Sequence, residues 1–254
     1  METFRLANRV AVVTGGTKGI GFAVVELFLK LGATVLFTGR SETEVASLEQ
    51  NWRKQYKNVY GFVAEETDIQ TLTSLQQFSR DTFGRVDILV NNAGTNLRKA
   101  TTAYTTQELD VLLSVNLKAP FLVSQFFYSL LQQSAAAAII NIGSVAGQFD
   151  VRTGSPYGMA KGGLLQLSRN LAVEWASAGI RVNSVSPWFT ETPLTAGLLA
   201  DSEKSKAVLA RTPLRRVAQP AEIAAAVAFF AMSEASFITG QNLVIDGGMS
   251  ANAL

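Results

Sequence analysis

Short apolar runs alternate along the chain with longer segments that carry polar residues on one side. Buried strands are predicted at residues 10–14, 34–38, 59–63, 86–90, 138–142, 181–185 and 243–245. Helices are predicted at 20–31, 41–55, 72–83, 106–133 with an interruption at Pro120, 157–178 and 221–232. Apolar strands separated by helices are typical of a parallel sheet covered on both faces. The pattern therefore predicts an α/β fold with a doubly wound parallel sheet of the Rossmann type, as a single domain over residues 1–254.

The stretch 188–213 follows the sixth predicted strand and has the least regular pattern of the chain. Prolines and threonines come first and polar residues later. Long loops are uncommon in compact domains and are often lids over an active site. We expect a substrate lid here, with a short helix of its own.

The residue content excludes several kinds of chemistry. The 254 residues include no cysteine and no histidine. Disulfides, thiolate catalysis, thiolate metal sites and Ser-His-Asp triads are therefore excluded, and we expect no metal site. Proton transfer must come from Tyr, Lys, Asp or Glu.

The charge and hydropathy of the chain argue against nucleic acid and membranes as partners. The net charge is only +2, and no run rich in Lys and Arg is present, so nucleic acid is not expected as a partner. No apolar run reaches about 18 residues, the length of a membrane span. The first ten residues lack the apolar core of a signal peptide. We expect a cytoplasmic protein without a membrane segment.

A glycine-rich turn, TGGTKGIG at residues 14–21, joins the first strand to the first helix. Glycines at such a turn let backbone N–H groups approach a pyrophosphate that a side chain would block. The start of the following helix adds roughly half a positive charge. An ordinary turn is the alternative, but the position between strand and helix at the start of a βαβ unit favours dinucleotide binding.

The end of the second strand indicates which dinucleotide is bound. NAD enzymes usually place an acid here, against the ribose 2′-hydroxyl, but residues 38–41 contain none. Arg40 stands there instead, with Lys18 in the glycine turn, and an arginine can bind a 2′-phosphate. We predict NADP(H), although the nearby Glu42 weakens the case. Asp68 could accept a hydrogen bond from the adenine amino group or cap the next helix, and both alternatives stay open.

Three residues form a candidate catalytic group. Ser144 follows the fifth strand, at the edge where parallel sheets bind ligands. Tyr157 and Lys161 are four residues apart on a predicted helix and share one face. Lowering the pKa of a tyrosine from about 10 to about 7 requires roughly 4 kcal/mol, which one cation about 4 Å away can supply. We expect Lys161 to be that cation, helped by an oxidised nicotinamide ring.

These residues have separate expected roles during reduction of a carbonyl. Ser144 would bind the carbonyl oxygen, and Tyr157 would donate its proton as hydride reaches the carbon. Lys161 would also hold the ribose hydroxyls of the nicotinamide nucleoside. Asn116, before Pro120 in the long helix, could bind a water that returns a proton to Lys161.

The motifs together resemble the short-chain dehydrogenase/reductase family over the whole chain, and its tropinone-reductase-like branch in particular. They are TGGTKGIG, NNAG at 91–94, the Asn in SVNL at 114–117, IGS at 142–144, YGMAK at 157–161 and TGQNLVIDGG at 239–248. The resemblance implies a catalytic tetrad of Asn116, Ser144, Tyr157 and Lys161. The implied cofactor-binding set, with the residues argued above, is Gly15, Thr17, Lys18, Gly19, Ile20, Gly21, Arg40, Asp68, Asn92, Gly94, Tyr157, Lys161, Thr190 and Thr192.

One position departs from the family pattern. Trp188 follows Pro187 where the family usually has glycine, so its ring could form a pocket wall or simply pack as an aromatic. The tropinone-reductase-like branch reduces small cyclic or hydrophobic ketones with NADPH, and we expect a small, uncharged, fairly apolar ketone here. The predicted substrate-binding residues are Leu97, Ser144, Phe149, Tyr157, Trp188 and Leu194.

Three other hypotheses concern function and assembly. Arg98, Lys99, Arg211, Arg215 and Arg216 could dock an acyl carrier protein, so a 3-oxoacyl carrier-protein reductase, or a sugar or polyol dehydrogenase, remains an alternative. A catalytically silent NADP-binding regulator is a more remote one. Family members are commonly homotetramers, and the apolar helices near 106–133 and 157–178 favour a homo-oligomer, dimer or tetramer. Their apolar residues include Phe121, Phe126, Phe127, Leu164, Leu165 and Leu167.

Overall fold

Seven parallel strands form the central sheet of the computed structural model, which describes residues 4–252. They are β1 (Val10–Val13), β2 (Thr34–Gly39), β3 (Val59–Val63), β4 (Ile88–Asn91), β5 (Ala138–Ile142), β6 (Arg181–Pro187) and β7 (Asn242–Ile245). Their order is β3-β2-β1-β4-β5-β6-β7, so the direction of winding reverses between β3 and β4. The predicted doubly wound sheet is confirmed; positions 1–3 and 253–254 of the predicted domain lie outside the described residues.

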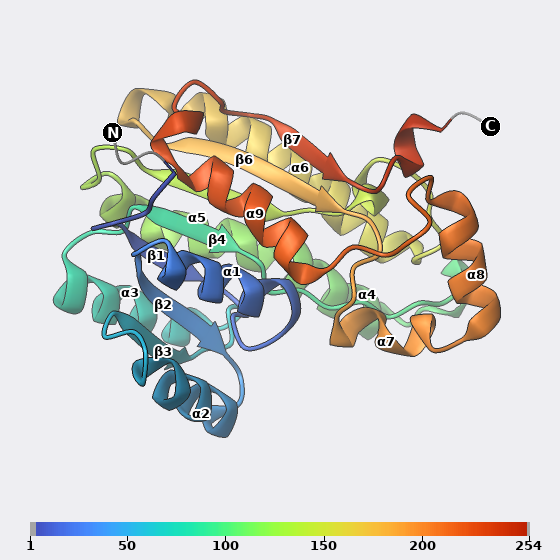
Figure 1. Ribbon diagram of the computed structural model, residues 1–254, viewed down its shortest axis with the longest axis horizontal. Helices are drawn as coiled ribbons and strands as arrows, with labels where there is room; N and C mark the ends of the chain where they lie inside the picture. The colour runs from blue at the N-terminus through green and yellow to red at the C-terminus, as the bar shows by residue number, and fades with distance from the viewer. Residues whose placement is uncertain (1–3, 253–254) are drawn as a thin grey trace.

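Helices cover both faces of this sheet (Figure 1). One face carries α1 (Gly19–Lys30), α2 (Glu42–Arg53) and α9 (Pro220–Ala231), and the other carries α3 (Ile69–Phe83), α5 (Ala119–Leu131) and α6 (Ser155–Glu174). Along β1, Ala11 and Val13 join the first core, whereas Val10 and Val12 join the second. Because both faces are buried, β1 is apolar at every position.

The predicted helix 106–133 is two helices joined by a π turn. α4 (Thr106–Leu113) leads through Ser114–Lys118 into α5, and Pro120 lies in the first turn of α5, directly after the π turn. By length and composition alone Thr106–Leu131 could cross a membrane. Its second half instead packs on the sheet through Val123, Phe127 and Leu131, as a core helix does.

The predicted lid contains two helices rather than one short helix. α7 (Pro193–Leu199) and α8 (Ser202–Arg211) lie on the side toward which the arrows of β6 and β7 point (Figure 1). Both ends of the lid are hydrogen-bonded to the segment at the end of β7. Trp188 N–H donates to Ile245 O at 2.9 Å, and Leu214 N–H donates to Gly247 O at 3.1 Å.

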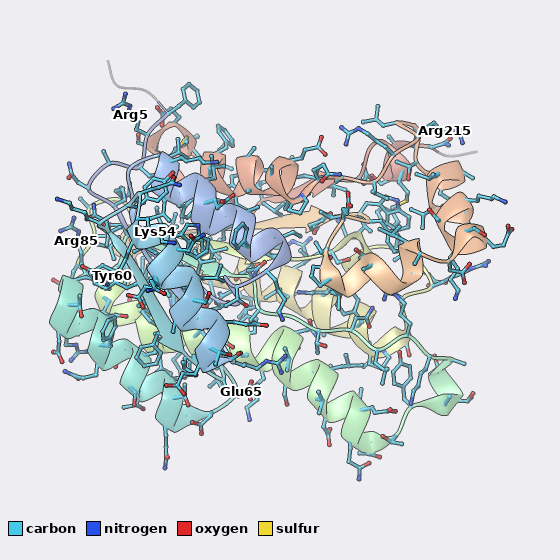
Figure 2. The ribbon with its side chains drawn as sticks, turned by 60° about the horizontal axis from the view of Figure 1, so that its bottom comes forward. Arg5, Lys54, Tyr60, Glu65, Arg85 and Arg215 are labelled. Carbon is cyan, nitrogen blue, oxygen red and sulfur yellow. The ribbon has the colours of Figure 1, made fainter. Side chains whose placement is uncertain are left out.

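A buried carboxylate fastens the opposite, amino-terminal edge of the sheet. Asp87 accepts hydrogen bonds from Val10 N–H at 2.8 Å and from the Ser134 hydroxyl at 2.5 Å, and it pairs with Arg85 at 3.2 Å. Arg85 and the lid-side Arg215 lie at opposite ends of the molecule (Figure 2). This cluster is therefore part of the framework, remote from the edge where the strands end.

The packing of α5 makes a test of the fold possible. Phe127→Ala removes a fully buried ring and should lower the free energy of unfolding by about 3–5 kcal/mol, because a cavity remains. Gln125→Ala, on an exposed position of the same helix, should change it by less than about 0.5 kcal/mol. Urea unfolding of the two variants measures both effects, and similar losses would contradict the assigned core face.

Candidate active site

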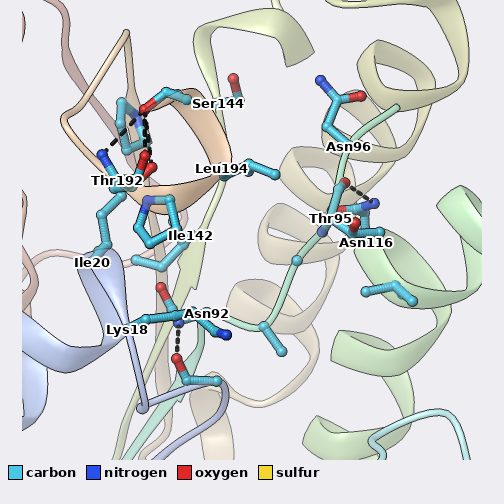
Figure 3. Close-up of a pocket in the computed structure, with 18 of the residues that line it drawn as sticks. Lys18, Ile20, Asn92, Thr95, Asn96, Asn116, Ile142, Ser144, Thr192 and Leu194 are labelled. Atoms are coloured by element: carbon cyan, nitrogen blue, oxygen red, sulfur yellow. Dashed lines mark hydrogen bonds between the residues drawn. The ribbon is translucent and has the colours of Figure 1, made fainter. Parts of the chain in front are cut away.

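A cavity of about 620 Å³ lies at the carboxyl edge of the sheet, where the winding direction reverses. Asn96, Thr95 and Asn116 lie on one side of it, across from Thr192 and Ile20 (Figure 3). Most of the predicted site residues line this cavity, namely Gly15, Thr17, Lys18, Gly19, Ile20, Arg40, Asn92, Gly94, Asn116, Ser144, Tyr157, Lys161, Trp188, Thr190, Thr192 and Leu194. Gly21, Asp68, Leu97 and Phe149 do not line it.

The glycine turn leaves its inner side open because two of its residues adopt left-handed backbone conformations. Gly15 has φ +62° and Gly19 has φ +58°, values that side chains disfavour. Gly21 acts from behind the turn, since a Cβ there would lie 2.3 Å from both the Asn92 amide nitrogen and Gly15 O. The turn can therefore approach a ligand backbone-first, as a pyrophosphate site requires.

Two polar residues hold this turn against the loop that follows β4. The Thr14 hydroxyl accepts from Asn92 N–H at 2.9 Å and from Ala93 N–H at 3.1 Å. In return the Asn92 amide donates to Thr14 O at 2.9 Å and to Gly15 O at 3.0 Å. These four hydrogen bonds fix the width of the crevice between β1 and β4.

Cations lie at the outer end of the cavity, beside β2. Arg40 is exposed and lines the cavity, and Lys18 Nζ lies 3.6 Å from a carboxylate oxygen of Glu44. Both cations are positioned to meet a phosphate. The acid that lines the cavity beside Lys18 and Arg40 is Glu44, whereas Glu42 does not line it.

Asp68 lies outside the cavity and caps α3. Its carboxylate accepts from Thr71 N–H at 2.8 Å and from the Thr71 hydroxyl at 2.6 Å, and these hydrogen bonds lower its pKa. The structure shows the helix cap, and the contact with the adenine amino group stays a prediction. The acids that line the cavity after β3 are Glu65 and Glu66.

Glu66 was missed by sequence reasoning. Only 6% of it is exposed, and it accepts a 2.5 Å hydrogen bond from the Thr38 hydroxyl, which accepts in turn from Gly15 N–H at 3.1 Å. Burial raises the pKa of this carboxyl. In the sequence EETD, Glu66 looks like an ordinary charged loop residue. Its position shortly after a strand, at the edge of the sheet where ligands bind, could have marked it as a site residue.

Lys161 is buried among backbone groups rather than beside an acid. Its ammonium donates to Ile142 O at 2.8 Å, and the side chain is only 4% exposed. Burial lowers the pKa of Lys161 to about 8. The same ammonium nitrogen lies 5.8 Å from the centre of the Tyr157 ring, so the predicted pair does share one face of α6.

The expectation of an acidic Tyr157 is wrong for the protein alone. The pKa of this phenol is raised, because burial outweighs a hydrogen bond from Ser144 and the positive charge of Arg98, both of which lower it. Lys161 does not lower it here, since its ammonium is directed to Ile142 O. Tyr157 is therefore held as a neutral proton donor.

Asn116 lies in the π turn and is fully buried. Its amide donates to Thr95 O and to Leu112 O, both at 2.9 Å, and its oxygen accepts from Thr95 N–H at 3.2 Å. Both amide hydrogens are thus occupied, and the side chain fastens the loop after β4 rather than presenting a free N–H to a water. The sequence could not reveal this, because the π turn itself was not predicted.

The substrate end of the cavity is mostly apolar. Trp188 packs edge-on against Phe189 with ring centres 4.7 Å apart, and its indole N–H donates to the Thr212 hydroxyl at 3.0 Å. Trp188 therefore forms a cavity wall and ties the two ends of the stretch 188–213 together, and Leu194 of α7 lines the same space. Leu97 and Phe149 are 38% and 45% exposed and lie outside it.

Comparison with known proteins places this chain among nucleotide-dependent reductases and dehydrogenases. The family described as enoyl-(acyl carrier protein) reductase matches residues 15–250. A tropinone reductase homolog of Arabidopsis thaliana is 43% identical over 99% of this chain and 97% of its own length. Senescence-associated protein 13 of the same plant is 40% identical over 97% of this chain and 92% of its own length.

Solved structures agree with the fold over nearly the whole chain. The gluconate 5-dehydrogenase from Burkholderia cenocepacia, in complex with NADP and tartrate, has a TM-score of 0.94 and 30% identity, with 98% of both chains covered. The RhlG/NADP active-site complex of Pseudomonas aeruginosa has a TM-score of 0.92 and 32% identity, covering 98% of this chain and 99% of that one.

The buried Glu66 makes stability depend on pH in a defined direction. Its pKa in the folded protein is above its ordinary value of 4.5, so stability falls as pH rises through that raised pKa. Glu66→Gln keeps an acceptor for Thr38 and removes the buried charge. The variant should unfold at higher urea concentration than the wild type at pH 8, with the difference vanishing near pH 4.

Asp68→Asn serves as the control, because the pKa of Asp68 is shifted in the other direction. Its stability should match or fall below the wild type at pH 8 and converge with it at low pH. Urea unfolding of the cofactor-free protein at several pH values measures both variants. A Glu66→Gln variant less stable than the wild type at pH 8 would contradict the assigned burial cost.

Proposed function

Since this chain belongs to the short-chain dehydrogenase/reductase family of oxidoreductases, we propose that it is an NADP(H)-dependent carbonyl reductase that interconverts a ketone and its secondary alcohol. The observation that carries the proposal is the position of Ser144, Tyr157 and Lys161. They lie in the same cavity as the glycine turn, so that a dinucleotide bound along it would bring its reactive end to the phenol.

The residues along the cavity fit NADP(H) in size and charge. Gly19 can offer its backbone N–H to the pyrophosphate, whereas Gly15 N–H is already donated to the Thr38 hydroxyl. A Cβ on Gly19 would lie 3.2 Å from Thr192. Arg40 and Lys18 would hold the 2′-phosphate. The dinucleotide supplies the hydride when bound.

The catalytic residues divide the remaining work. Ser144, whose hydroxyl already accepts from Ala146 N–H at 3.1 Å, can donate its own hydrogen to the substrate's carbonyl oxygen. Tyr157 gives its proton to that oxygen as negative charge develops there, and its raised pKa keeps the proton in place until then. Lys161, whose ammonium nitrogen lies 5.8 Å from the centre of the Tyr157 ring, can hold the ribose hydroxyls of the bound dinucleotide.

The apolar wall of Trp188, Phe189 and Leu194 favours a small ketone with an apolar body, in line with relatives named tropinone reductase homologs. A sugar or polyol dehydrogenase remains the second candidate, because similar structures are named gluconate 5-dehydrogenases. Docking of an acyl carrier protein is less favoured, since Lys99 is paired with Glu108 and Arg216 with Glu222. A silent regulator is disfavoured by the complete catalytic group.

We also propose a homo-oligomer and a cytoplasmic location. Three of the apolar helix residues are buried within the subunit and so carry no information on a partner, namely Phe127, Leu164 and Leu165. Phe121 on α5 is 45% exposed. An exposed ring on an apolar helix favours burial against another copy. The location is a proposal from sequence only, and one relative is named chloroplastic.

Removing the phenol hydroxyl tests the proposed reaction. Tyr157→Phe should lower kcat for ketone reduction by about 10²–10⁴-fold, because the proton donor is lost while the ring stays. Binding of NADPH, measured by its fluorescence, should be largely unchanged. A variant that keeps its turnover would remove Tyr157 from the mechanism.

Reversing the charge beside β2 tests the choice of cofactor. Arg40→Asp should reduce the ratio of kcat/KM with NADPH to that with NADH by about tenfold or more, because a charge-assisted hydrogen bond to the 2′-phosphate becomes repulsion. Lys54→Asp, at an exposed position at the end of α2 (labelled in Figure 2) that does not line the cavity, should leave the ratio as it is. An equal ratio in the Arg40 variant and the wild type would refute the NADP assignment.

A further inference from the structure

We propose that Arg98 binds a carboxylate of the substrate, so that the ketone reduced is an oxo acid with an apolar body. The inference rests on the proposed function, because it names the substrate class for the same site. It also changes the expectation of an uncharged ketone, and it starts from a cation for which the protein provides no counter-charge.

Arg98 stands at the catalytic end of the cavity. It lies in the loop that follows β4 and lines the cavity together with Tyr157. The guanidinium is close enough for its charge to lower the pKa of the Tyr157 phenol. One substrate molecule can therefore place its carbonyl oxygen at Tyr157 and an anionic group at Arg98.

Within residues 4–252, no ion-pair or hydrogen-bond partner is found for the Arg98 side chain, and its Nε is completely enclosed. The next residue, by contrast, is paired: Lys99 Nζ lies 2.5 Å from a carboxylate oxygen of Glu108. A half-buried guanidinium whose Nε has no partner carries a desolvation cost, and this desolvation lowers the pKa of Arg98. A protein can keep a cation with this desolvation cost when a bound anionic ligand offsets the cost.

The cofactor is not placed to satisfy Arg98. Its phosphates would lie along Gly15 and Gly19 and between Lys18 and Arg40, at the other end of the cavity. The second tyrosine near Arg98 cannot serve either, because the Tyr104 hydroxyl donates to Leu97 O at 2.5 Å and accepts from Lys99 N–H at 3.1 Å. The missing anion must come with the substrate.

A carboxylate matches this position better than other anions of a small ketone. The planar guanidinium binds two carboxylate oxygens side by side, which fixes the orientation of the molecule as well as its charge. Val151, Trp188 and Leu194 give the lining an apolar part. A short hydrocarbon chain or ring between carbonyl and carboxylate would fill that space.

Matched pairs of ketones test the proposal. The probes are 4-oxocyclohexanecarboxylate and 5-oxohexanoate, each compared with its methyl ester, in NADPH-dependent reduction by the wild type, Arg98→Met, Arg98→Lys and Lys99→Met. The acids should exceed their esters in kcat/KM by roughly 10- to 100-fold in the wild type. Arg98→Met should abolish that ratio, chiefly by raising KM for the acids, and Arg98→Lys should restore part of it. Lys99→Met, whose ammonium belongs to Glu108, should keep the ratio.

The outcomes separate this inference from the function on which it rests. Turnover of esters by Arg98→Met shows that the variant is folded and serves as the internal control. Esters that react as well as acids in the wild type, or an acid preference that survives in Arg98→Met, overturn the role of Arg98 and leave the reductase intact. Equal loss of acids and esters in Arg98→Met also overturns it. Absence of turnover with every ketone overturns the proposed function itself.

Discussion

The crevice lies between the loop that follows β1 and the loop that follows β4. These loops leave neighbouring strands in different directions and must still be held together. Thr14, at the end of β1, and Asn92, after β4, hold them together through four hydrogen bonds between a hydroxyl, an amide and the backbone. These contacts satisfy polar groups that the reversal of the sheet would otherwise leave unpaired. They also fix the glycine turn relative to the loop that carries Arg98. The distance between the two ends of the cavity is set here, before any catalytic residue is considered.

The site that this framework holds is electrostatically expensive. A lysine with its pKa lowered to about 8, a carboxyl with a raised pKa and an unpaired guanidinium lie around one cavity, and burial is the first cause of each shift. Perturbed ionisable groups in one cleft are typical of functional sites. The core of two apolar layers supplies the stability against which these costs are set, which is the usual relation between activity and stability.

The sequence predicted what depends on local pattern and missed what depends on three-dimensional packing. β3 and β5 match their predicted ranges, because each is a short, mostly apolar run that local sequence reveals. The π turn around Asn116 has no local signal, since it arises from packing against the loop after β4. Asp68 and Glu66 are both acids after one strand, and only the course of the backbone decides which enters the cavity. The direction of the Tyr157 shift required knowing where the Lys161 ammonium points.

The lid begins and ends at neighbouring points of the frame, since Trp188 and Leu214 both donate to the segment that ends β7, and the Trp188 indole reaches Thr212. The segment between these two points is a long loop with two helices whose ends lie close together. Because Thr190 and Thr192 line the cavity beside the glycine turn, only the part beyond Thr192 can change in length and composition without disturbing the nucleotide crevice. Surface loops with close ends tolerate insertion and replacement. An architecture of this kind separates the inheritance of a reaction from the acquisition of new substrates, and grafting 193–211 between relatives is a route to altered selectivity on an unchanged catalytic base.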